Sequence, residues 1–141
     1  MVAQYDEQGI QFAYPDNWSI ADEELEDMPR GVSVQSPSGA YWDVKLFSQE
    51  ESPAWICDQA LQAMREVYEN VEAEAVTEGI CGLPATGYNL DFFCLDFLVT
   101  TYLRCLVVGQ RIALLTYQAE SQEFEQQRAV FDAITKSFLS D

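Results

Sequence analysis

Apolar and polar residues alternate along most of the chain, and this period of two predicts β-strands. We expect strands at residues 9–14, 18–20, 31–35, 40–47, 71–78, 85–95, 99–108 and 111–119. Turn residues separate several of these runs: SPSG stands between the third and fourth, GLP before the sixth, and GQ between the last two. Connections this short predict antiparallel pairing, and the last three strands read as a meander.

Two segments instead repeat apolar residues every three or four positions, which is typical of an amphipathic helix. The first begins with Ser52 as cap and Pro53 as first residue, and runs to about Asn70. Its predicted buried stripe consists of Ile56, Cys57, Ala60, Leu61, Met64, Val67 and Tyr68. The second begins at Ser121, whose hydroxyl can cap the first turn. Its stripe consists of Phe124, Val130, Phe131, Ile134 and Phe138.

The faces of the strands predict how these elements are layered. In the strand at 40–47, Trp42, Val44 and Leu46 share the expected core face. The last two strands are apolar on both faces, so each face of the sheet must be covered. The two predicted helices can each cover one face. We therefore predict an α+β fold: a three-layer α/β/α sandwich with a central, mainly antiparallel sheet. A chain of 141 residues suits a single domain over residues 1–141.

The charge balance limits the partners of this chain. Seven Lys and Arg stand against 24 Asp and Glu, a net charge of −17. Such a chain repels phosphate backbones and anionic headgroups, so we expect no nucleic-acid partner and no membrane insertion. The N-terminal MVAQYDEQGIQF lacks the basic and apolar regions of a secretory signal, so we expect a cytoplasmic protein.

Acidic residues are also the candidate site. Five carboxylates gather within six positions of the segment 21–31, and three more alternate along the strand at 71–78. The candidate partner-binding residues are Asp22, Glu23, Glu24, Glu26, Asp27, Glu72 and Glu74. The segment 21–31 can be a solvated loop or short helical turn, or a contact for a basic partner. Its spacing lacks the glycine and alternating ligands of a calcium loop.

The available side chains exclude several chemistries. The chain has no histidine, the commonest general base and zinc ligand, and its four cysteines form no CxxC pair. We expect the cysteines to be reduced and buried, with a disulfide between Cys94 and Cys105 as the alternative. No nucleophile elbow, phosphate loop or dinucleotide fingerprint is present. The sequence therefore predicts no catalytic residue, cofactor or metal.

Three local sequence patterns follow one another along the chain. They are GIQFAYPDNW at 9–18, GLPA at 82–85, and LTY at 115–117 followed by the phenylalanine stripe of the last helix. Together they resemble the PsbP/Mog-like superfamily, including its bacterial members. The resemblance implies an antiparallel sheet between helices and non-enzymatic work: binding a protein partner, stabilising an assembly, or chaperoning secretion cargo.

Three functions remain open. The first is a non-catalytic interaction or assembly module whose acidic surface meets a basic or amphipathic protein segment. The second is a binder of a small hydrophobic ligand between the first helix and the sheet, near Trp42, Trp55 and Met64. The third is a carboxylate-based hydrolase, which the number of acidic residues allows but no pair of them singles out.

Overall fold

The computed structural model describes residues 1–7, 9–23 and 30–140. Its strands are β1 (Val2–Glu7), β2 (Ile10–Pro15), β3 (Ser19–Glu23), β4 (Arg30–Gln35), β5 (Tyr41–Ser48), β6 (Glu72–Ile80), β7 (Leu83–Cys94), β8 (Phe97–Val108) and β9 (Arg111–Glu120). Its helices are α1 (Pro53–Val67) and α2 (Ser121–Leu139). The predicted helices and the predicted meander are confirmed, with shifts of a few residues at their ends.

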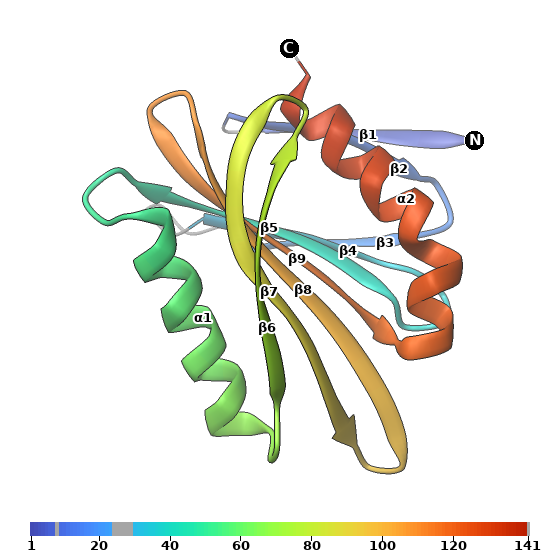
Figure 1. Ribbon diagram of the computed structural model, residues 1–141. Helices are drawn as coiled ribbons and strands as arrows, with labels where there is room; N and C mark the ends of the chain where they lie inside the picture. The colour runs from blue at the N-terminus through green and yellow to red at the C-terminus, as the bar shows by residue number, and fades with distance from the viewer. Residues whose placement is uncertain (8, 24–29, 141) are drawn as a thin grey trace.

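Seven strands form one sheet in the order β3-β4-β5-β9-β8-β7-β6, and every neighbouring pair is antiparallel. The pairing of β5 with β9 joins segments far apart in the chain, because α1 and β6 to β8 lie between them in sequence. β1 and β2 form a separate two-stranded sheet beside α2 (Figure 1). There the Ala13 N–H donates to Ser137 Oγ at 2.9 Å.

The two helices lie on opposite faces of the large sheet (Figure 1). α2 buries Phe124, Phe131 and Ile134 in a core shared with β2, β4, β5, β8 and β9. α1 buries its own stripe against the other face of β7, β8 and β9. This arrangement confirms the predicted three-layer sandwich, and Trp42, Val44 and Leu46 lie in the core as expected.

A buried polar cluster joins α2 to the sheet. Trp42 Nε1–H donates to Thr135 Oγ1 at 2.9 Å, and the Tyr117 hydroxyl forms a short hydrogen bond with the same oxygen. The Thr135 hydroxyl also reaches the carbonyl of Phe131, one turn back along α2, at 3.0 Å. Its two lone pairs and its proton are therefore used.

Several local predictions were wrong. Residues 2–7 form β1, which was not predicted because Tyr5 is its one buried residue. The strand predicted at residues 18–20 is longer, as β3 (Ser19–Glu23), and pairs with β4 in the large sheet. Val67 lies outside the buried stripe and is 71% exposed. Glu120, rather than Ser121, caps α2, because its carboxylate accepts from the Gln122 N–H.

The cysteines follow the prediction in part. All four are free thiols, so the alternative of a disulfide is not seen. Cys57 and Cys105 are buried, but Cys81 is exposed in the β6–β7 turn, where its φ is 50°. None of the helices in the described part of the chain combines the length and the apolar character needed to cross a bilayer.

Candidate interaction surface

The β7–β8 hairpin ends in an apolar tip. Cys94 pairs with Phe97, so the turn consists of Leu95 and Asp96. Leu95 has a φ of 57°, a conformation that glycine adopts freely and that costs a bulky L-residue about 1–2 kcal/mol. A large apolar residue therefore occupies a place where the turn alone would favour glycine.

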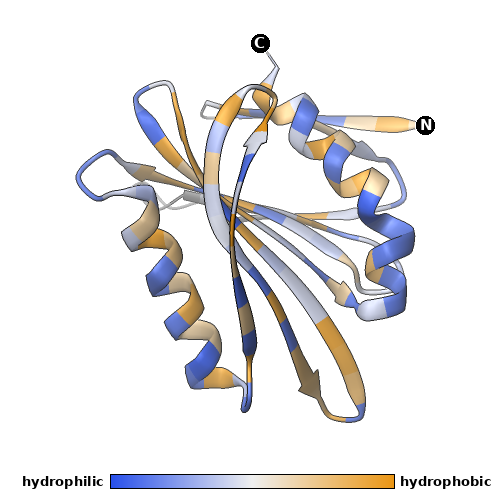
Figure 2. Cartoon of the chain, viewed as in Figure 1, coloured by the Kyte–Doolittle hydropathy of each residue, from blue (hydrophilic) through white to orange (hydrophobic). Residues whose placement is uncertain are grey.

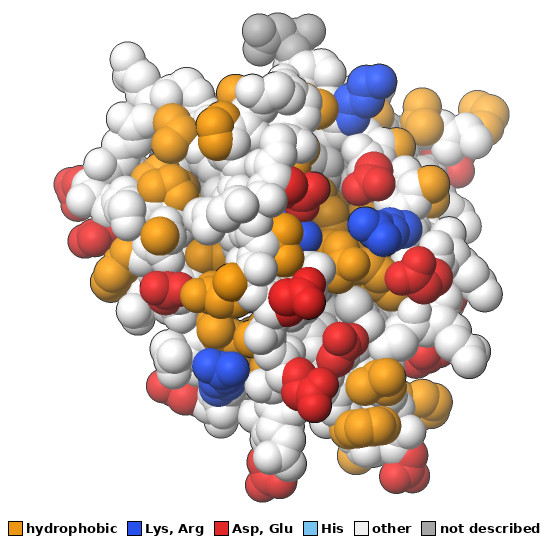
Figure 3. Space-filling view, in the orientation of Figure 1, with side chains coloured by type: hydrophobic (Ala, Val, Ile, Leu, Met, Phe, Trp, Pro, Cys, Tyr) orange, Lys and Arg blue, Asp and Glu red, His pale blue; other side chains and the backbone are white. Residues whose placement is uncertain are grey.

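The side chains of this tip point into solvent. Phe93 is 67% exposed, Leu95 90%, Phe97 62% and Leu98 38%. We call these four residues the hairpin tip. Figure 2 shows the strongly apolar colouring of the tip, which extends past the N-terminal end of α2. Figure 3 shows the apolar cluster at the end of the hairpin, beside acidic side chains. Exposed patches of this kind in soluble proteins mark contact sites.

The base of the hairpin is fixed on both faces of the sheet. On the α2 face, Thr100 Oγ1 donates to Asp91 Oδ1 at 2.8 Å and lies 2.8 Å from Ser121 Oγ. The Ser121 hydroxyl also donates to the Leu98 carbonyl at 3.1 Å. On the α1 face, the buried ring of Phe92 stacks on Tyr68 with centroids 4.3 Å apart. The tip is thus presented from a held base, which reduces the entropy lost on binding.

An acidic groove leads to the hairpin tip. It has a volume of about 400 Å³ and is lined by Glu72, Ala73, Glu74, Asn89, Asp91, Thr100, Tyr102 and Glu125. We call it the acidic groove. Strand register explains why the groove leads to the tip. Glu72 on β6 lies opposite Asp91 on β7. Two residues further along the same face of β7 is Phe93, which lies opposite Leu98 on β8.

The acidic groove carries a local electrostatic penalty. Glu72 and Asp91 are direct cross-strand partners, and like charges in that relation are destabilising. Glu74 from β6 and Glu125 from the first turns of α2 bring the carboxylates of the groove to four. Within the described residues, no group of three or more His, Cys, Asp or Glu is arranged to hold a metal ion.

The structure separates the predicted acidic residues. Glu72 and Glu74 lie in the acidic groove on edge strand β6. Asp22 and Glu23 belong to β3, at the opposite edge of the same sheet. Glu24, Glu26 and Asp27 lie outside the described residues. The two acidic segments are therefore not neighbours within the sheet, because five strands lie between the edge strands β3 and β6.

Sequence reasoning missed part of this surface. Asp91 and Glu125 were not singled out, because they reach the groove only through strand pairing and the position of α2. The hairpin tip did leave a signal: DFFCLDFLV places large apolar residues on both sides of a two-residue turn, where polar residues are usual.

A second cavity lies between α1 and the sheet. It has a volume of about 430 Å³, and its lining includes Tyr41, Lys45, Phe47, Trp55, Ile56, Met64 and Leu114. Trp55, which is 48% exposed, and Met64 were expected here. Trp42 was also expected here, and that was wrong: it is fully buried on the α2 face and bonds to Thr135.

The layered sheet and its two helices have the PsbP/Mog-like fold, as the resemblance implied. The chain is similar to cyanobacterial PsbP (CyanoP) from Synechocystis sp. PCC 6803, with a TM-score of 0.69, 10% identity, and coverage of 96% of this chain and 90% of that one. It is similar to the Ran-binding protein Mog1p of Saccharomyces cerevisiae, with a TM-score of 0.61, 9% identity, and coverage of 99% and 96%. A Pseudomonas aeruginosa protein of unknown function, PA94, described as a putative regulator, gives a TM-score of 0.58, 9% identity, and coverage of 99% and 97%.

At identities this low, the likeness defines the fold alone. Neither a protein-family model nor the sequence of a curated protein matches this chain.

Proposed function

We propose that this protein is a non-catalytic interaction module that binds a protein segment carrying both basic and apolar side chains. The continuity of the acidic groove with the hairpin tip carries the proposal, because one partner segment can use both. Its basic residues would neutralise Glu72, Glu74 and Asp91, and its apolar residues would cover Phe93 and Leu98. A protein of the same fold, Mog1p, is described as Ran-binding, which agrees with a binding role.

The two parts of this surface have different roles in binding. Carboxylates at an exposed rim mainly accelerate encounter and select partners by charge. Large apolar side chains that become buried supply most of the affinity. The net charge of −17 favours a basic partner at long range, while the hairpin tip decides where that partner docks.

A charge-matched comparison tests the acidic groove. The probe is a synthetic amphipathic peptide of lysine and leucine, with a glutamate and leucine peptide as negative control. The groove variant carries Glu72→Gln, Glu74→Gln and Asp91→Asn. Each change removes one negative charge, so the net charge rises from −17 to −14.

The control variant removes three exposed carboxylates elsewhere, by Glu50→Gln, Glu51→Gln and Glu66→Gln, and has the same net charge. Binding is measured by fluorescence anisotropy at several salt concentrations. The groove variant should bind the lysine peptide about tenfold more weakly, because three exposed charge contacts contribute about 0.5 kcal/mol each. The control variant should keep most of its affinity. Equal weakening in both variants would show attraction to net charge alone and would refute the groove.

The hairpin tip is tested by Leu95→Gly. Glycine relieves the positive φ at this position, so the variant should be no less stable than the original protein. Binding of the lysine peptide should nevertheless fall, by about thirtyfold if Leu95 is a buried anchor worth about 2 kcal/mol. Glycine at the Leu95 position with unchanged affinity would remove the tip from the proposal.

The cavity beneath α1 supports a second candidate function, the binding of a small hydrophobic ligand. Its volume of about 430 Å³ and its mixed lining of Phe47, Trp55 and Met64 with Lys45 suit a small amphiphile. Native mass spectrometry of the purified protein tests this candidate function, because a bound ligand would add its mass to that of the chain. A co-purifying ligand that is lost on Met64→Trp, which fills the cavity, would support it. An apo mass together with no quenching of Trp55 fluorescence by fatty acids would count against it.

A further inference from the structure

Cations gather at one place in this acidic protein. A pocket of about 330 Å³ lies between the β6–β7 end of the sheet and α2, and Arg104, Arg128 and Lys136 all line it. These are three of only seven Lys and Arg in a chain with 24 acidic residues. Figure 3 shows blue side chains, together with red ones, around a hollow on this face. The pocket lies on the α2 face of the sheet, further from the hairpin tip than the acidic groove.

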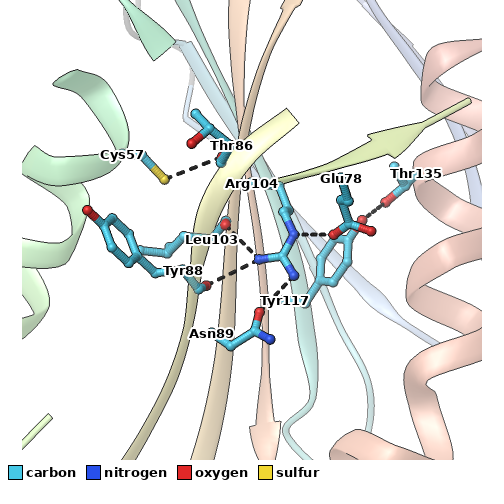
Figure 4. Close-up of polar contacts among 9 residues, drawn as sticks. All are labelled: Cys57, Glu78, Thr86, Tyr88, Asn89, Leu103, Arg104, Tyr117 and Thr135. Carbon is cyan, nitrogen blue, oxygen red and sulfur yellow. Dashed lines mark hydrogen bonds and ion pairs between the residues drawn. The ribbon is translucent and has the colours of Figure 1, made fainter. Parts of the chain in front are cut away.

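Arg104 is a fixed part of the pocket. It is 3% exposed, and its Nη1 donates to the carbonyls of Leu103 at 2.9 Å and Tyr88 at 3.3 Å. Its Nη2 donates to Asn89 Oδ1 at 2.7 Å, and its Nε forms an ion pair with Glu78. Figure 4 shows the guanidinium held among these groups, with its partners on β6, β7 and β8.

The space for this side chain comes from Gly87, its cross-strand partner, which leaves no side chain opposite it. A buried arginine with this set of partners holds its position without any ligand.

The other two cations are not used in this way. Among the described residues, neither Arg128 nor Lys136 forms an ion pair within 4.0 Å. Neither Glu125 nor Asp132, each about one helical turn away on α2, forms an ion pair with these cations. The Arg128 guanidinium lies 5.4 Å from the centroid of the Tyr102 ring, and Arg104 lies 4.8 Å from the same centroid. Arg104 is already paired with Glu78, so Arg128 is the guanidinium on this ring that has no carboxylate partner among the described residues.

The remaining lining suits a small organic molecule. Tyr117 and Thr135, whose hydroxyls bond to each other, lie at its buried side, and Ile80 and Tyr102 supply apolar surface. Asp132 stands between Arg128 and Lys136 on α2, and burial raises the pKa of its carboxyl above the ordinary range.

We infer that this pocket binds a small organic carboxylate, whose carboxylate group is held by Arg128 and Lys136. Arginine and lysine are the usual partners of a carboxylate, and the planar guanidinium can make two parallel hydrogen bonds to it. The volume of about 330 Å³ is at the lower end of the range for small-molecule sites, so the ligand is of metabolite size. Arg104 and its partner Glu78 form the wall behind it. The site adjoins the acidic groove, with which it shares Tyr102, but it does not depend on the proposed protein partner.

Thermal unfolding with added anions tests this inference. The probes are sodium succinate and sodium benzoate, compared with neutral succinamide and with sodium chloride at equal ionic strength. At a concentration a hundred times its Kd, a ligand that binds only the folded protein raises Tm by several degrees. At least one carboxylate should give a saturable rise, and its amide and chloride should not. No saturable rise with either carboxylate, or an equal rise with sodium phosphate, would overturn the assignment.

Variants locate the binding. Lys136→Gln should weaken the apparent Kd at least about tenfold, because one charged hydrogen bond is lost. Arg128→Gln should do the same, and Arg111→Gln, an exposed arginine outside the pocket, should leave the Kd unchanged. Because Arg128 also contacts Tyr102, its loss can lower stability; Lys136→Gln, whose side chain has no such contact, keeps the test decisive. An unchanged Kd in both pocket variants would refute the site.

Discussion

Replacing Thr135 with valine separates the polar link between α2 and the sheet from the packing around it. Valine has nearly the shape of threonine, so the change removes the hydroxyl and leaves the volume. Thr135 is 2% exposed, and its Oγ1 is the acceptor for Trp42 Nε1–H at 2.9 Å and a partner of the Tyr117 hydroxyl. After the change, the Trp42 N–H is buried without an acceptor.

The expected loss follows from these contacts. A buried donor left without a partner costs about 1–3 kcal/mol. The Tyr117 hydroxyl also loses its partner, but it lines the pocket between the sheet and α2, where water can replace part of the bond. The sum is about 2–4 kcal/mol. An unfolding entropy of about 2.1 cal/mol/K per residue gives about 0.3 kcal/mol/K for this chain, so Tm should fall by about 10 °C.

Urea and thermal unfolding, followed by tryptophan fluorescence and circular dichroism, measure this loss. Thr135→Ser is the matched control, because it keeps the hydroxyl and removes one methyl group, at a cost of about 1 kcal/mol. The order of stability should be threonine, then serine, then valine. A valine variant at least as stable as the serine variant would show that packing, and not the hydrogen bonds, joins α2 to the sheet.

Three further predictions concern glycine, alkaline pH and thiols. Gly87→Ala should lower the free energy of unfolding in urea by more than about 3 kcal/mol, because the new Cβ would lie 1.7 Å from a backbone oxygen of β8. Gly79→Ala is the control: its Cβ would meet nothing within 4 Å, so stability should change little. Burial raises the pKa of Tyr117 and of Cys105 to about 12. The folded state then keeps protons that the unfolded state loses, so unfolding free energies measured against pH should be level below about pH 8.5 and fall towards pH 12. A thiol reagent at pH 8 should modify Cys81 first and reach Cys105 only on unfolding, as peptide mapping would show. A rise in stability above pH 10, or early labelling of Cys105, would contradict the burial of these groups.

The local elements were predictable because periodicity is a property of neighbouring residues. The stripe of Phe124, Phe131 and Ile134 identified α2 and its buried face, and the structure confirms both. The two apolar faces of β8 and β9 predicted a cover on each side, and the helices provide it. The strand β1 was missed for a local reason. It is mostly exposed, so its sequence does not show the alternation of apolar and polar residues by which the other strands were predicted.

The candidate surface was predictable only in part. Glu72 and Glu74 were singled out because three carboxylates alternate along one strand. Their neighbours Asp91 and Glu125 are 19 or more positions away from Glu72 in the chain and meet it through strand register and helix placement. No short window of sequence contains that relation, so it had to come from the structure.

The sequence by itself determined the helices, every strand except β1, most of the buried faces, and the absence of histidine chemistry. These follow from the spacing and identity of residues close together in the chain. The tertiary structure alone decided the order of the strands, and with it the separation of β3 from β6, the pairing of β5 with β9, and the meeting of Arg104, Arg128 and Lys136 in one pocket. The physical reason is that strand order results from the total free energy of pairing and packing among distant segments, which no local pattern specifies.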